Sequence, residues 1–106
     1  MFDEALALAN ATPCDPKTLT RAARDFAQTH PAFAVEAGLA ALRWLVRGFG
    51  YEFTAVDVKA AYSHTLKAAD NAGVRGAVGP RILALFDEPA ARSGFVASII
   101  GKEVGL

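Results

Sequence analysis

The feature that most constrains the fold is a nearly uninterrupted apolar stretch over residues 31–47. Only three of its seventeen residues are charged, namely Glu36, Arg43 and Arg47, and they lie seven and four positions apart. On an α-helix this spacing places them along one narrow stripe. A helix that is apolar around the rest of its circumference has to be enclosed by other elements. We therefore predict that residues 31–47 form the central helix of a small all-α domain, with Leu39, Leu42 and Val46 in its core.

Proline, glycine and capping residues divide the remainder of the chain into further helices. Asp15 before Pro16 predicts a helix start, and Thr12 with Asp15 is a competing capping pair. Thr54 with Asp57 three residues later predicts a capping box. The expected helices are 2–10, 16–28, 31–47, 55–72, a short one opened by Pro80, and 89–101. Together they predict one domain over residues 1–106, a compact bundle of five to six helices.

Composition narrows the classes of function. Eleven basic and eleven acidic residues cancel, so net charge gives no general attraction to nucleic acid or to an anionic membrane. The hydrophobic fraction of 53% and the mean hydropathy of +0.25 are high for a small domain, which favours apolar surface that is left for a partner. Charges inside 31–47 argue against a membrane span. A single cysteine and an N-terminus without signal-peptide features indicate a cytoplasmic protein.

The best small-ligand candidate is the glycine-rich stretch 73–81, which we predict to be a loop before the helix at Pro80. Glycines permit close backbone approach to a ligand, and a helix N-terminus attracts anions. Two arginines there suit a phosphate or a carboxylate, although the pattern matches neither common phosphate-binding motif. A flexible connector is the competing interpretation. The candidate ligand-binding residues are Arg75, Gly76, Gly79, Arg81 and, nearby, His64.

The sequence offers little that indicates catalysis or metal binding. The two histidines, His30 and His64, are 34 residues apart, and no second polar group is predicted to converge on His64. Cys14 is expected to pack against Leu19 as an unreactive thiol. These spacings lack the ligand sets typical of zinc sites. We therefore expect a non-catalytic protein with no cofactor and no metal.

Two surfaces remain as possible interaction sites. The exposed face of helix 16–28 carries Lys17, Arg21 and Arg24, which we interpret as a solvated basic face. The helix pair 16–28 and 31–47 resembles a helix-turn-helix only superficially, because an apolar second helix cannot read base edges. The final helix presents large apolar residues at helical spacing, and twofold pairing would cover them. The predicted interface of a homodimer is Phe95, Val96, Ile99 and Ile100.

Two hypotheses for function follow from these patterns. The first is a non-catalytic helical protein that acts through protein–protein interaction or self-association. The alternative is a module that binds an anionic metabolite or phosphate at the stretch from Gly73 to Arg81.

Overall fold

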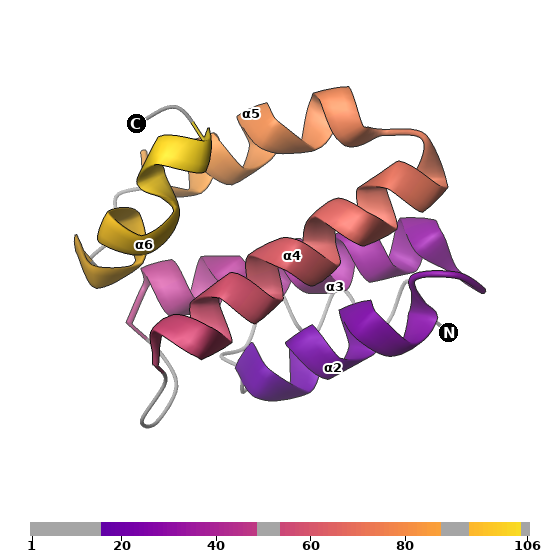
Figure 1. Ribbon diagram of the computed structural model, residues 1–106, viewed down its shortest axis with the longest axis horizontal. Coiled ribbons are helices and arrows are strands. Elements are labelled where there is room, and N and C mark those ends of the chain that lie inside the picture. The colour runs from indigo at the N-terminus through magenta and orange to yellow at the C-terminus, as the bar shows by residue number, and fades with distance from the viewer. Residues whose placement is uncertain (1–15, 49–53, 88–93, 105–106) are drawn as a thin grey trace.

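The apolar stretch forms helix α3, Pro31–Val46, at the centre of an all-α fold (Figure 1). The computed structural model describes residues 16–48, 54–87 and 94–104. Eleven of the sixteen residues of α3 are buried, and they include all three of its predicted core residues, Leu39, Leu42 and Val46. The central position of α3 therefore follows from a circumference that has almost no face suited to water.

Helices α3 and α4, Ala55–Ala72, form a central pair, and each contacts every other helix of the described residues. Helix α2, Pro16–Phe26, packs on one side of this pair. Helices α5, Arg75–Leu85, and α6, Gly94–Val104, contact the pair and each other but not α2. In Figure 1, α2 and α4 run in the same direction, whereas α3 and α5 run in the opposite one. All regular structure in the described ranges is helical, as predicted.

The ends of α4 are fixed by local sequence at both termini. At the N-terminus, Thr54 and Asp57 form the predicted capping box, in which the Thr54 N–H donates to Oδ2 of Asp57 at 2.8 Å. At the C-terminus, Gly73 adopts φ 73°, in the left-handed region that suits glycine. The Gly73 N–H donates to the Asp70 carbonyl and the Val74 N–H donates to that of Ala69, which is the Schellman arrangement. The predicted span 55–72 is confirmed.

Replacing Thr54 with alanine is expected to lower the free energy of unfolding by roughly 0.5–2 kcal/mol, because it removes the side-chain half of this cap. Urea denaturation followed by circular dichroism measures the change. Thr29→Ala, at an exposed turn position, is the control and should change stability by less than about 0.5 kcal/mol. Equal effects of the two substitutions would contradict a role for the cap.

The region 73–81 is where the sequence prediction of a loop is wrong. Helix α5 begins at Arg75, and Pro80 lies inside it rather than at its start. Proline removes one N–H from the helix ladder, and the two nearby glycines disfavour helix, so local propensity argues against this result. Burial outweighs propensity, because α5 presents one apolar face to the core through Val78, Ile82 and Leu85.

Smaller differences concern three other segments. Helix α2 ends at Phe26 instead of about residue 28. The last helix, Gly94–Val104, continues past the predicted end at residue 101, so Gly101 is a buried residue inside it. The stripe of Glu36, Arg43 and Arg47 is half-buried, with the Arg47 guanidinium carbon 5.1 Å from the centroid of the Trp44 ring. The predicted helix 2–10, the caps at Thr12 and Asp15, and residues 88–93 lie outside the described residues.

Across the described ranges, no helix combines the length and the apolarity that crossing a membrane requires.

Candidate functional site

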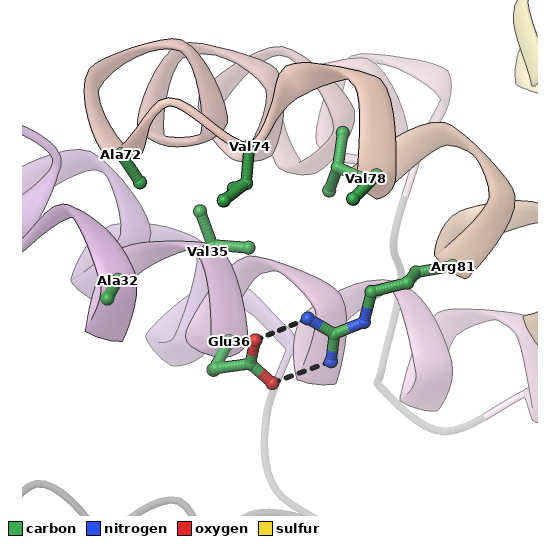
Figure 2. A pocket seen from close by; sticks show the side chains of 8 residues that line it. Ala32, Val35, Glu36, Ala72, Val74, Val78 and Arg81 are labelled. Atoms are coloured by element: carbon green, nitrogen blue, oxygen red, sulfur yellow. Dashed lines mark hydrogen bonds and ion pairs between the residues drawn. The ribbon is translucent and has the colours of Figure 1, made fainter.

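An apolar groove lies between the N-terminal halves of α3 and α5 (Figure 2). Its volume is about 220 Å³. Val35 and Val78 are buried in its walls, whereas Val74 is 40% exposed, one of two large hydrophobic side chains exposed in the described part of the chain. The groove is thus apolar, with two buried valines in its walls and several lining residues exposed to solvent. Its lining residues are Ala32, Val35, Glu36, Ala72, Val74, Ala77, Val78 and Arg81.

One end of the groove carries an ion pair between α3 and α5. The Arg81 guanidinium donates two hydrogen bonds to the Glu36 carboxylate, from Nη1 at 2.5 Å and from Nη2 at 2.7 Å. This forked geometry is the strong form of the arginine–carboxylate interaction. The hydrogen bonds that Arg81 donates to Glu36 raise the pKa of Arg81 above its ordinary value.

The predicted ligand-binding arginines do not converge on one site. Arg75 donates to Oδ2 of Asp70 at 2.7 Å, and among the two only Arg81 lines the groove. Gly76 and Gly79 are part of helix α5 and do not line the groove. The Val78 N–H donates to the Val74 carbonyl within the first helical turn. The prediction of an open loop is therefore wrong, because residues 75–81 form the first part of helix α5.

His64 lies away from this groove. It is half-buried on α4. Burial lowers the pKa of His64, nearby Arg24 and Lys67 lower it further, and Asp25 partly opposes them. The charged groups that act on His64 therefore belong to α2 and α4. Nothing in the described residues supports the prediction that His64 joins the stretch 73–81 in binding a ligand.

The final helix packs its apolar residues largely within its own chain. Val96 is 0% exposed and Ile100 is 2% exposed, so both belong to the core of the domain. Ile99 is partly buried and packs against the same core. The Phe95 side chain lies outside what the structure describes. The homodimer remains a prediction. Among the predicted interface residues whose side chains are described, Ile99 is the one that is still partly exposed and could contact a second copy.

The described ranges hold no cluster of side chains suited to a metal ion. There, no three of the His, Cys, Asp and Glu side chains lie close enough to hold a metal ion. His30 is exposed and shares a 3.1 Å hydrogen bond with the Thr29 hydroxyl. Cys14 lies outside the described residues, so the expectation of an unreactive thiol stays a prediction.

Comparison with known proteins adds no family to this picture: no family model, no curated protein and no solved structure matches the chain. A functional assignment has to rest on the chain's own residues.

The sequence prediction missed most of the groove. Ala32, Val35 and Glu36 belong to the apolar stretch, whereas Val78 and Arg81 belong to the segment interpreted as a loop. The one available signal was Glu36, a single carboxylate in the first half of an apolar helix. Its partner Arg81 is 45 residues away, and no sequence spacing connects the two.

Proposed function

We propose that this protein is a non-catalytic interaction module, and that the groove between α3 and α5 receives an apolar side chain from a protein partner. The observation that carries the proposal is the groove itself, an apolar hollow with an exposed valine at its edge. Apolar pockets that receive a large side chain are the usual centres of protein–protein interfaces.

The size of the groove favours a side chain over a metabolite or a cofactor. Small-molecule sites usually enclose roughly 300–1,000 Å³, whereas this groove has about 220 Å³. An apolar cavity of about 150 Å³ accommodates benzene, so the groove fits one aromatic ring or one branched aliphatic side chain. The volume of the groove therefore favours an apolar side chain of a partner protein over an anionic metabolite.

The Arg81–Glu36 ion pair at the end of the groove also favours an apolar side chain over an anionic metabolite. Arg81 already donates two hydrogen bonds to Glu36. A ligand carboxylate that displaced Glu36 would leave that side chain charged and unpaired beside the new anion, at an electrostatic cost. A neutral apolar group avoids this cost. The ion pair then forms the polar rim of the groove, and its free lone pairs and N–H groups can bind a neighbouring backbone amide of the partner.

Filling the groove from within tests the proposal. Ala77 is exposed and lines the groove, so Ala77→Leu should occupy it without disturbing the core. Ala84→Leu is the matched control, because Ala84 is exposed on the same helix and is not a lining residue. Random peptides displayed on phage are selected against wild type. We expect selected peptides to share one large apolar residue, to shift the methyl resonances of Val35, Val74 and Val78, and to bind Ala84→Leu normally.

Ala77→Leu should weaken binding of these peptides by at least about tenfold, which corresponds to roughly 1.4 kcal/mol. Peptides that bind Ala77→Leu as well as wild type would show that the groove is not the anchor. The same conclusion follows if wild type enriches no peptide above the Ala77→Leu background. A small apolar molecule that shifts the three valines while no peptide does would favour the ligand-binding alternative.

The second candidate partner is another copy of the same chain. This self-association has less support than binding to a different protein. Two of its predicted contact residues, Val96 and Ile100, are buried within the chain. Sedimentation equilibrium decides the point, because a species of 11.1 kDa at high micromolar concentration would exclude the homodimer. A cytoplasmic location belongs to the same proposal.

A further inference from the structure

Basic side chains of α2 and α4 come to the same level along the two helices. The Asn71 Nδ2 donates to the Ala27 carbonyl at 2.8 Å, which fixes the register of α4 against the end of α2. The two helices run in the same direction (Figure 1). With a rise of about 1.5 Å per residue, Arg24 and Lys67 each lie about one turn before this contact.

One turn further back, Arg21 on α2 is level with the region of His64 on α4. Arg21, Arg24 and Lys67 are exposed, and His64 is half-buried. The proximity of Arg24, His64 and Lys67 has independent support, since Arg24 and Lys67 both act electrostatically on His64. Arg21 is placed by the helix register. We call these four residues, Arg21, Arg24, His64 and Lys67, the basic ridge.

Acidic groups neutralise the basic ridge only in part. Asp25 accepts a hydrogen bond from Arg24 at 2.9 Å, at a site where both side chains are about half exposed. Asp70, the next acidic residue after Lys67 on α4, pairs with Arg75 instead. Counted over the described residues alone, three cations and one carboxylate leave the ridge with a net positive charge, on a chain whose formal net charge is zero.

We propose that the basic ridge docks an acidic segment of a protein partner, with carboxylates one helical turn apart. Side chains three or four residues apart on a helix have Cβ atoms about 5–6 Å apart. Arg21 and Arg24 have this spacing, and an acidic helix with glutamates at i and i+4 offers the matching one. A nucleic-acid backbone suits the ridge less well, because such binding draws its affinity from many phosphate contacts. This surface is separate from the groove and does not depend on it.

A synthetic peptide pair tests the proposal on the full chain. The probe is a fluorescent alanine-rich helical peptide with glutamates at i and i+4, and its partner has glutamine at those positions. Fluorescence anisotropy near 0.15 M salt, where exposed charges are strongly screened, should detect binding of the glutamate peptide only. Arg24→Gln and Lys67→Gln should each weaken binding by roughly two- to fivefold, and the double variant by more than either.

Two control variants separate the ridge from general charge and from the groove. Lys59→Gln removes an exposed cation from α4 about two turns before Lys67, and it should leave the affinity unchanged. Ala77→Leu fills the groove and should also leave it unchanged. Equal weakening by Lys59→Gln and Lys67→Gln would overturn the proposal, as would equal binding of the glutamine peptide.

The imidazole of His64 provides a second readout by NMR. In the free protein, burial, Arg24 and Lys67 hold the pKa of His64 below its ordinary value, against the opposing effect of Asp25. Carboxylates that dock on the ridge should raise this pKa, so the glutamate peptide should bind more tightly as pH falls toward it. An unchanged His64 titration in the complex would contradict the proposal. Stronger competition by a DNA duplex or by inorganic phosphate than by the glutamate peptide would also overturn it.

Discussion

Leu42→Ala is expected to lower the free energy of unfolding by about 2–5 kcal/mol. Leu42 is 0% exposed in the middle of α3, the helix that contacts all the other described helices. Truncation removes buried methyl groups and leaves a cavity, because neighbouring helices on several sides cannot collapse together into the space. Since small domains have a total stability of roughly 5–15 kcal/mol, this single change should bring the protein close to unfolding.

Urea denaturation of wild type and variant measures the difference. Leu83→Ala is the matched control, because Leu83 is half-buried on α5 and loses less apolar contact on truncation. We expect a clearly smaller loss for Leu83→Ala. A loss below about 1 kcal/mol for Leu42→Ala would mean that α3 is not the centre of the fold.

Gly38→Ala is the second substitution with a large expected effect. A Cβ atom at position 38 would lie only 3.0 Å from the Cβ of Thr65 on α4 and in steric overlap with its Oγ1. Thr65 cannot move aside easily, because it is 0% exposed and its hydroxyl donates to the Ala61 carbonyl at 2.6 Å. We expect overpacking to cost about 1–3 kcal/mol or more. This loss should appear although alanine is the better helix former.

Two further variants identify the cause of that loss. Thr65→Ala removes the hydroxyl that overlaps, so the double variant should recover part of the stability lost in Gly38→Ala. This favourable coupling is measured by a double-mutant cycle. Gly76→Ala is the control, since it lies in helix α5 with nothing within 4 Å of the added Cβ. It should stabilise the protein by roughly 0.4–1 kcal/mol. If both glycine substitutions stabilise, the close contact of α3 and α4 is not present in solution.

Local patterns predicted the helices whose boundaries depend on local interactions. The capping box at Thr54 and the left-handed glycine at Gly73 fixed both ends of α4, and both signals lie within a few residues of the helix. The central helix was predictable for a related reason, because an apolar circumference admits few solutions other than enclosure. The exposed basic face of α2 followed from the helical period, and Lys17, Arg21 and Arg24 are exposed as expected.

Helix α5 shows where local signals fail. Three glycines and a proline within eight residues are typical of a connector, and each disfavours helix on its own. The apolar contacts of Val78, Ile82 and Leu85 outweigh these preferences, but they form only against residues distant in the chain. In place of an open loop, the Ala77 and Val78 amides donate to the Val74 carbonyl at the start of α5.

The sequence by itself determined the all-α class, the central place of residues 31–46 and the ends of α4, because periodicity and capping are local properties of the chain. Only the tertiary structure decided where a groove forms on the surface and which charged side chains lie close together. It joined Glu36 to Arg81 across 45 residues, opened the groove between α3 and α5, and brought Arg24 of α2 near His64 of α4. Helix periodicity tells which face of a helix is buried, whereas the partner of each side chain depends on how the helices are arranged in space.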